Sequence, residues 1–316
     1  MRILLATPAE PGTQSGNGRT AARYVELWSA LGHEVIVTTE QRFEEVELLV
    51  ALHATKCAAV LDTFAERAPA VPRMVVVAGT DLSGSERARF ELSLERASAI
   101  VTLQPLALQA LPERFAGKAR SIVQSVLLPA RLRDAQRRRV DCEIALVAGL
   151  REVKDPLRIA YATVDLPAPS RIFVTHYGPS LDAELALEAN ELMKRNPRYR
   201  WHGPQPHETT LDLMHRASAL CNTSLSEGGA NVVSEALALS CPVLCSAIPG
   251  NLGVLGSDWP ATFTSGSTEA LRDLLLRFEA DADLRDDLAQ RTAHLRELVQ
   301  PACEREGWAQ LFSAMK

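Results

Sequence analysis

The stretch that decides the fold is Ala219-Leu220-Cys221-Asn222-Thr223, followed by Ser224-Leu225-Ser226-Glu227-Gly228-Gly229-Ala230-Asn231-Val232-Val233-Ser234-Glu235-Ala236. The first five residues form a short, mostly apolar run that predicts a buried strand. A helical pattern follows and extends to about Leu239. The stretch is therefore one strand–loop–helix unit, and its loop lies at the carboxyl end of a strand, where α/β sheets bind ligands.

The same alternation of strands and helices runs along the whole chain. Apolar runs are separated by amphipathic stretches such as 19–31 and 56–67. Continuous apolar strands between helices predict parallel sheets that are covered on both faces. The expected strands are Arg2–Thr7, Glu34–Thr39, Glu47–His53, Arg73–Ala78, Ala99–Leu103, Arg120–Gln124, Glu143–Ala148, Arg171–His176, Tyr199–Trp201, Ala219–Thr223, Pro242–Ser246 and Ala261–Thr264.

The alternation pauses once, at 127–140. This segment contains Pro129 and a cluster of arginines, and its pattern favours a solvated connector. The predicted fold is therefore α/β, with two Rossmann-like parallel-sheet domains that face a cleft. They span 1–138 and 139–301, and a C-terminal helix at 302–316 packs back onto the first domain.

Composition excludes several classes of protein. The 316 residues are 47% hydrophobic and 23% charged, which is ordinary for a globular chain and unlike a disordered one. The 34 Lys and Arg against 39 Asp and Glu give a net charge of −5, without the basic excess of a nucleic-acid binder. No apolar run is long enough to span a bilayer, and Pro8 ends the first apolar run too early for a signal peptide. With six scattered cysteines and no Cys-x-x-Cys pair, the sequence predicts a soluble cytoplasmic protein.

The loop at 224–231 carries the strongest chemical signal. Gly228 and Gly229 allow a ligand to approach the backbone closely. The N–H groups of Gly228, Gly229, Ala230, Asn231 and Val232 can bind an anion at the start of the helix. Glu227 and Glu235 can accept hydrogen bonds from several hydroxyl groups of one ligand, such as a nucleotide sugar. The alternative is that Glu227 only caps the helix and Glu235 faces solvent.

A second segment, Gly149-Leu150-Arg151-Glu152-Val153-Lys154-Asp155-Pro156, follows the first strand of the second domain. Arg151 and Lys154 are two fixed cations at the carboxyl end of that strand. They can neutralise a leaving diphosphate without a metal ion. An ordinary exposed loop of mixed charge is the alternative.

The first domain offers candidates for a second substrate. Gly16, Asn17, Gly18 and Arg19 lie in a glycine-rich segment at 8–20, which we expect to be a flexible loop above the cleft. His53, Thr80, Asp81 and Gln104 each follow a strand and converge on the same sheet edge. The pattern from Gly16 to Ala21 imitates a dinucleotide fingerprint, but its first glycine lies too far from the strand. A nicotinamide oxidoreductase is therefore a minor alternative.

No metal site is predicted. His202, His207 and His215 lack a Cys or carboxylate at ligand spacing. The sequence Asp281-Ala282-Asp283 fits an Asp-x-Asp pattern that can hold a metal–diphosphate, but it precedes a predicted helix, and capping explains it better.

The residues from Glu227 to Glu235 resemble the Glu-x7-Glu motif of retaining GT-B glycosyltransferases of family four. Arg151 and Lys154 resemble the diphosphate-binding pair of that family, and the resemblance covers the full length. It implies that Glu235 binds the ribose and Glu227 the hydroxyls of the donor sugar, with no cofactor beyond a UDP-sugar as co-substrate. A small-molecule acceptor would enter from the first domain.

A narrower resemblance is to the selenosugar synthases of selenoneine biosynthesis. It rests on 150–158, 196–201, 227–236 and Ile248-Pro249-Gly250-Asn251. It implies transfer from a UDP-sugar to selenophosphate. Two alternatives stay open: a transferase to a hydroxyl acceptor, with His53 or Asp81 as the base, and a non-catalytic nucleotide-sugar-binding module.

Overall fold

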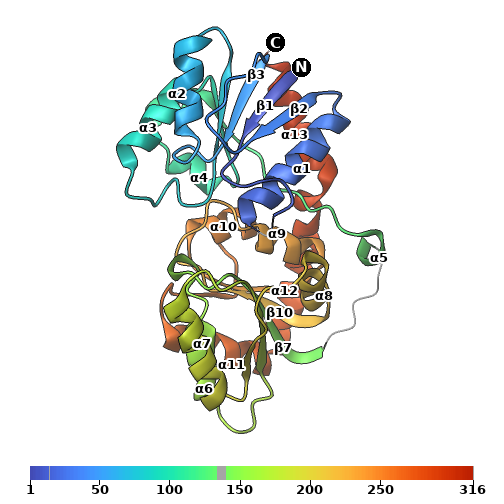
Figure 1. Ribbon diagram of the computed structural model, residues 1–316. Coiled ribbons are helices and arrows are strands. Elements are labelled where there is room, and N and C mark those ends of the chain that lie inside the picture. Colours follow the sequence, from blue (N-terminus) through green and yellow to red (C-terminus); the bar gives the residue numbers. More distant parts are fainter. Residues whose placement is uncertain (14, 134–139, 316) are drawn as a thin grey trace. The chain divides into compact units, whose positions relative to one another are not determined.

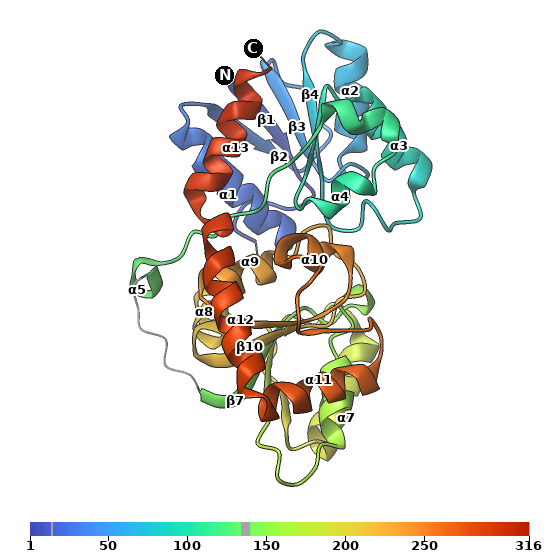
Figure 2. The same ribbon diagram turned by 180° about the vertical axis from the view of Figure 1, so that it is seen from behind.

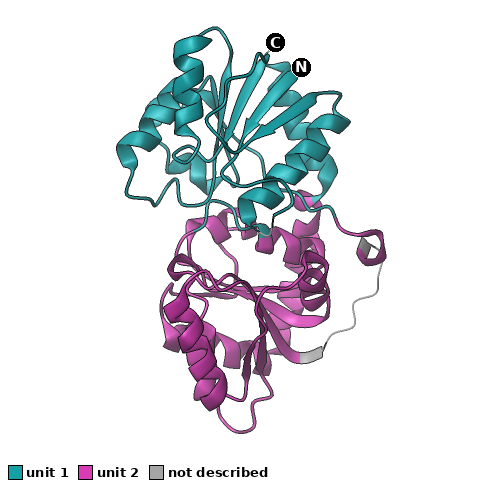
Figure 3. Ribbon diagram, viewed as in Figure 1, with its two compact units in different colours: residues 1–127, 227–231, 300–316 teal, residues 128–226, 232–299 magenta. Residues whose placement is uncertain are grey.

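The computed structural model describes residues 1–13, 15–133 and 140–315. The chain divides into two compact units (Figure 3). Unit 1 comprises Met1–Leu127, Glu227–Asn231 and Gln300–Lys316, and unit 2 comprises Leu128–Ser226 and Val232–Val299. The expected domain boundary between 138 and 139 lies outside the described residues, as does the final residue of the expected C-terminal helix.

Unit 1 is built on a six-stranded sheet with the order β2-β1-β3-β4-β5-β6. Every neighbouring pair in it is parallel. The strands are β1 (Arg2–Ala6), β2 (Glu34–Thr38), β3 (Leu48–Leu52), β4 (Arg73–Val77), β5 (Ala99–Thr102) and β6 (Ala119–Ser121).

Helices cover both faces of this sheet (Figures 1 and 2). Alternate residues of β1 enter different cores: Ile3 and Leu5 pack with α1 and α13, while Leu4 and Ala6 pack with α2 and α3. This two-sided burial explains why the strands are continuous apolar runs. The helices are α1 (Gly16–Ala30), α2 (Ala58–Arg67), α3 (Arg87–Arg96), α4 (Leu106–Gln109), the 3-10 helix η1 (Glu113–Lys118) and α13 (Pro301–Ser313).

The C-terminal helix α13 is part of unit 1, as the sequence predicts. Its Trp308 packs edge-on against Tyr24 and Trp28 of α1, with ring centroids 4.9 and 5.0 Å apart. A buried ion pair joins Glu304 Oε2 to Arg23 Nε at 2.9 Å. The helix begins at Pro301, one residue before the predicted start, at a position where proline costs no hydrogen bond.

Unit 2 contains a second six-stranded parallel sheet with the order β12-β11-β10-β7-β8-β9. Its strands are β7 (Val140–Val147), β8 (Phe173–Tyr177), β9 (Tyr199–Trp201), β10 (Ala217–Asn222), β11 (Val243–Ser246) and β12 (Thr262–Phe263). Its helices are α5 (Ala130–Arg133), η2 (Glu152–Lys154), α6 (Arg158–Val164), α7 (Ala183–Arg195), α8 (His207–Arg216), α9 (Asn231–Ala238), α10 (Pro249–Leu255), α11 (Thr268–Ala280), α12 (Ala282–Leu295) and η3 (Arg296–Val299). One of them, α9, begins at Asn231, which the contacts assign to unit 1.

The predicted fold class is confirmed, since each expected strand overlaps an observed one in two parallel sheets. Strand ends differ by a few residues. For example, β7 begins at Val140, inside the predicted connector, and α5 forms there as well. Among the described helices, none is both long and apolar enough to cross a membrane.

Candidate functional site

In unit 2, two of the predicted segments meet at one edge of the sheet. Strands β7 and β10 are parallel neighbours, with Ile144 opposite Ala219, so the loops that follow them share that edge. Two hydrogen bonds join these loops. Leu225 N donates to Val153 O at 2.9 Å, and Thr223 Oγ1 donates to Lys154 O at 2.9 Å. The loop after β10 therefore holds the backbone of the turn that carries the two predicted cations.

The turn itself is compact. Lys154 N donates to Arg151 O at 2.9 Å, and Asp155, the residue that follows η2, has a φ of 42° in the left-handed region. The Asp155 carboxylate pairs with Arg158 at 2.8 Å. Arg151 is exposed and Lys154 is half-buried. The backbone of the turn is thus fixed, and both cationic residues lie on this turn, just after the carboxyl end of β7.

A buried imidazole supports the base of this turn. His176 Nε2 lies 2.8 Å from Ala148 O, and its Nδ1 lies 2.7 Å from the Tyr199 hydroxyl. The carbonyl can only accept, so Nε2 carries the proton and Nδ1 accepts from the tyrosine. Burial lowers the pKa of His176 to about 4, which keeps the ring neutral at neutral pH.

Glu235 does not face solvent. It is 4% exposed, and its Oε1 lies 2.9 Å from His207 Nε2, at the first residue of α8. Both residues belong to unit 2. A buried carboxylate beside a half-exposed imidazole can accept hydrogen bonds from a polar ligand.

The loop Glu227–Asn231 belongs to unit 1 by its contacts, and there its two glycines have a structural role. A Cβ on Gly228 would lie 2.8 Å from Gly79 N, and one on Gly229 would lie 2.6 Å from Leu103 Cβ. Close packing against the ends of β4 and β5 therefore requires glycine at both positions. The sequence suggests only the approach of a ligand as the reason for these two glycines, and the structure adds a second reason, close packing within unit 1.

Buried polar side chains anchor the same loop. Gln124 Nε2 donates to Gly229 O at 2.9 Å, and Arg23 donates to Gln124 Oε1 at 2.7 Å. Asn231 Nδ2 donates to Gly16 O at 3.2 Å. Since Arg23 also pairs with Glu304, the network extends from the glycine loop to the C-terminal helix.

The segment Gly16–Arg19 is not the expected flexible loop, because it forms the first turn of α1. Ser15 caps this helix, and its Oγ accepts from Gly18 N at 3.0 Å, so that amide is already used. A Cβ on Gly18 would lie 2.0 Å from Thr13 Oγ1. The glycine therefore serves local packing. Asn17 and Arg19 lie in the same helical turn.

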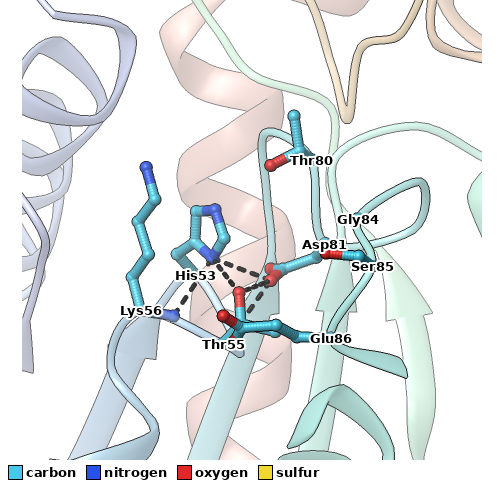
Figure 4. Close-up of a pocket in the computed structure, with 8 residues that line it drawn as sticks. All are labelled: His53, Thr55, Lys56, Thr80, Asp81, Gly84, Ser85 and Glu86. Atoms are coloured by element: carbon cyan, nitrogen blue, oxygen red, sulfur yellow. Dashed lines mark hydrogen bonds and ion pairs between the residues drawn. The ribbon is translucent and has the colours of Figure 1, made fainter. Parts of the chain in front are cut away.

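His53, Thr80 and Asp81 do come together in unit 1. They line a cavity of about 320 Å³ with Thr55, Lys56, Gly84, Ser85 and Glu86 (Figure 4). His53 Nδ1 lies 2.7 Å from Asp81 Oδ1, and both side chains are buried. His53 has a φ of 93°, a strained value for a residue other than glycine.

Gln104 and Cys57, which do not line this cavity, have structural roles. Gln104 is buried, and its Oε1 accepts from Ala107 N at 3.1 Å, so it caps the short helix α4. Burial raises the pKa of the Cys57 thiol to about 12, and its Sγ donates to Leu52 O. That thiol therefore stays protonated and is a poor nucleophile.

In the part of the chain that the structure describes, no three His, Cys, Asp or Glu side chains are grouped to hold a metal ion. Asp281 caps α12 by accepting from Leu284 N at 2.9 Å, which confirms the capping interpretation of the Asp-x-Asp sequence.

Comparison with known proteins adds a family match. Residues 141–294 match the model of the family "Glycosyl transferases group 1". That range includes Arg151, Lys154, Glu227 and Glu235. A curated relative, glycosyltransferase 1 domain-containing protein 1 of Xenopus tropicalis, is 32% identical over 112 residues. This match covers 35% of the chain and 32% of the relative, so the chain spans about a third of that protein.

Solved structures match over almost the whole chain. A sucrose-phosphate synthase from Thermosynechococcus elongatus is similar with a TM-score of 0.79 at 14% identity, covering 99% of this chain and 98% of that one. HepE from Anabaena, solved with UDP and glucose, gives 0.76 at 13% identity over 99% and 100%. The fold is GT-B.

Two further residues belong to these sites although no motif in the sequence marks them. Lys56 lines the cavity of unit 1, and its place three residues after His53 was a usable signal. His207 was considered only as a metal ligand, although it begins a helix after β9, at the same edge of the sheet as the other loops.

Proposed function

We propose that this chain is a glycosyltransferase that moves a sugar from a UDP-sugar, of the UDP-GlcNAc or UDP-glucose type, to selenophosphate. The observation that carries the proposal is the cationic turn at Arg151–Lys154, fixed by the loop after β10 within the segment that matches the family. Structural neighbours solved with UDP and with UDP-glucose support the choice of donor.

In this proposal unit 2 binds the nucleotide. Arg151 and Lys154 stabilise the charge that develops on the leaving diphosphate, which contributes more in the transition state than in the bound donor. Two fixed cations can do this without a metal ion. Glu235, beside His207, accepts from the ribose hydroxyls.

The loop from Glu227 to Val232 serves the sugar. Glu227 accepts from its hydroxyls, and amides among Gly228, Gly229, Ala230, Asn231 and Val232 donate to the sugar or the phosphates. The contacts that hold Gly228 and Gly229 in unit 1 keep this loop in one conformation. We also propose that the reaction takes place in the cytoplasm, in keeping with the scattered cysteines.

The reaction forms one bond and breaks one bond in its first step. A selenium electron pair of selenophosphate attacks the anomeric carbon, and the bond from that carbon to the UDP oxygen breaks, with its electrons leaving on UDP. Water then attacks phosphorus and breaks the selenium–phosphorus bond, giving phosphate and a 1-seleno sugar. Selenophosphate is already nucleophilic at selenium, so a strong general base is unnecessary.

Mass spectrometry tests this proposal. The protein is incubated with each UDP-sugar and selenophosphate, and a parallel reaction contains a simple alcohol acceptor. A selenium-bearing sugar with release of UDP and phosphate is expected. Transfer to the alcohol without any selenium-bearing sugar would reject selenophosphate but retain a glycosyltransferase.

A hydroxyl acceptor is the second candidate, and one observation favours it. His53 is paired with buried Asp81, which leaves its second ring nitrogen able to take a proton from a hydroxyl group. A non-catalytic nucleotide-sugar-binding module would bind the donor and transfer its sugar to neither acceptor.

A further inference from the structure

The cavity at the ends of β3 and β4 is lined by one cation, one imidazole and three hydroxyls, which come from two turns. Lys56, His53 and Thr80 line it together with Thr55 and Ser85. Figure 4 shows the Lys56 and His53 side chains extending in the same direction, with the Thr80 hydroxyl turned toward them. His53 is 2% exposed, whereas Lys56 is exposed. The buried ring therefore lies behind a flexible cation.

Asp81 fixes the orientation of the imidazole. Asp81 Oδ2 accepts from Ala54 N at 2.8 Å and Ala78 N at 3.0 Å. Its Oδ1 accepts from Thr55 N at 3.1 Å and Thr55 Oγ1 at 2.9 Å, and it lies 2.7 Å from His53 Nδ1. Thr55 Oγ1 and Lys56 N also lie near Nδ1, at 3.1 and 3.4 Å. The contact with the carboxylate is the shortest, and a carboxylate that accepts from four other donors can only accept, so Nδ1 carries the proton and Nε2 remains for whatever enters the cavity.

The strained backbone of His53 agrees with this role. A φ of 93° costs energy, and the structure maintains it through Asp81, which binds the amides of the next two residues. The same carboxylate thus holds both the backbone and the ring of His53. Asp81 is a positioning residue, since both of its oxygens are used by donors of the chain itself.

We propose that this cavity binds a phosphate-type oxyanion that carries one proton. Its oxygens accept from Lys56 Nζ and the Thr80 hydroxyl, and its P–OH group donates to His53 Nε2. The proposal rests on the proposed function in one respect: it makes this oxyanion the phosphate group of the acceptor. Donors and a cation are what an oxyanion requires, and a cavity of about 320 Å³ has room for one with its bound water. Glu86, at the rim, carries the opposite charge and therefore weakens the site.

Titration of the intact protein with inorganic phosphate, without any sugar donor, tests the site. Calorimetry measures the affinity, and proton NMR follows the His53 ring, assigned by its loss in His53→Gln. Lys56→Ala should weaken phosphate binding about tenfold. Glu86→Gln should strengthen it about twofold, because an exposed like charge is removed. Lys194→Ala, which removes an exposed cation of unit 2, should leave the affinity unchanged.

Nitrogen NMR tests the role of Asp81. In the wild type at a pH where the ring is neutral, the proton of His53 should lie on Nδ1. In Asp81→Asn it should move at least in part to Nε2, a change that loss of packing alone would not produce. If that variant does not fold, the wild-type spectrum decides, because a proton on Nε2 would overturn the positioning role.

The outcomes separate the site from the proposed function. Phosphate binding that is absent, or equal in wild type and Lys56→Ala, would overturn the oxyanion site even if a selenium-bearing sugar forms. Stronger binding after Lys56→Ala, or weaker binding after Glu86→Gln, would indicate a cation site and would also overturn it. Phosphate binding as expected, without any selenium-bearing sugar, would leave the site intact and reject the acceptor.

Discussion

The two sheets end in two differently built groups of polar residues. In unit 1, after β3 and β4, the side chains hold one another: Asp81 holds His53, and both are buried. In unit 2, after β7 and β10, hydrogen bonds hold the backbone of the cationic turn: Leu225 N donates to Val153 O and Thr223 Oγ1 donates to Lys154 O, while the Arg151 side chain is exposed.

The difference reflects what each group must do. A ring that presents one particular nitrogen has to be held in a single orientation, so its partner must be buried with it. A guanidinium or ammonium group acts at the end of a long stem, and only the base of that stem needs a fixed place. Both turns also contain a residue of positive φ other than glycine, His53 at 93° and Asp155 at 42°.

The largest expected effect concerns the buried ion pair between Arg23 and Glu304 in unit 1. Glu304→Ala removes a carboxylate that accepts from Arg23 Nε at 2.9 Å and Ser125 N at 2.7 Å. Arg23 would remain buried without a carboxylate to neutralise it, so the free energy of unfolding should fall by about 3–5 kcal/mol. Chemical denaturation measures this loss. Glu306→Ala, an exposed change on the same helix, is the control. If both variants lose the same free energy of unfolding, the ion pair does not contribute to stability.

The next effect concerns the base of the turn in unit 2. His176 has a folded-state pKa of about 4 against an ordinary 6.5, so between these values the unfolded chain binds more protons. The stability that His176 contributes is present above pH 6.5 and should decrease by about 3 kcal/mol as the pH falls to 4. Unfolding of wild type and His176→Gln across that range measures the change. A difference between the two proteins that stays constant with pH would contradict it.

Lys154→Ala tests the cationic turn of unit 2. Loss of this cation should lower turnover about 100-fold, because the leaving diphosphate loses a fixed charge. Its melting temperature should stay close to that of the wild type, since Thr223 and Leu225 bond to backbone atoms. Lys194→Ala is the charge-matched control. Turnover at the wild-type rate would remove Lys154 from the proposed mechanism.

The smallest expected effect concerns the glycine loop. Gly228→Ala would place a Cβ 2.8 Å from Gly79 N, a backbone atom that cannot move aside without strain. We expect a loss of about 1–2 kcal/mol in the free energy of unfolding of unit 1. Gly117→Ala is the matched control, because no heavy atom lies within 4 Å of its added Cβ. If both variants are equally stable, close packing is not the reason for glycine at 228.

The sequence predicts the strands well because burial on both faces leaves continuous apolar runs, as in Leu48–Leu52 and Arg73–Val77. It also places polar residues at strand ends, and the edge of a parallel sheet then brings His53 and Asp81 together. Partners that are distant along the chain are not predictable in this way. Glu304 meets Arg23 across 281 positions, and His207 meets Glu235 across 28, with no local pattern to mark either contact.

Local interpretation fails at the glycines for the same reason. Gly18 appears as part of a flexible ligand loop, whereas Ser15 caps a helix there and Thr13 occupies the space of a Cβ. Gly228 and Gly229 are equally ambiguous, because close approach by a ligand and close approach by Gly79 or Leu103 require the same residue.

The central claim is that the cationic turn of unit 2 binds the diphosphate of a uridine nucleotide. Calorimetry with UDP and with NAD, on wild type and on Lys154→Ala, tests this most directly. The account predicts that UDP binds to the wild type, that it binds more weakly to the variant, and that NAD does not bind. Tight binding of NAD without binding of UDP would contradict it.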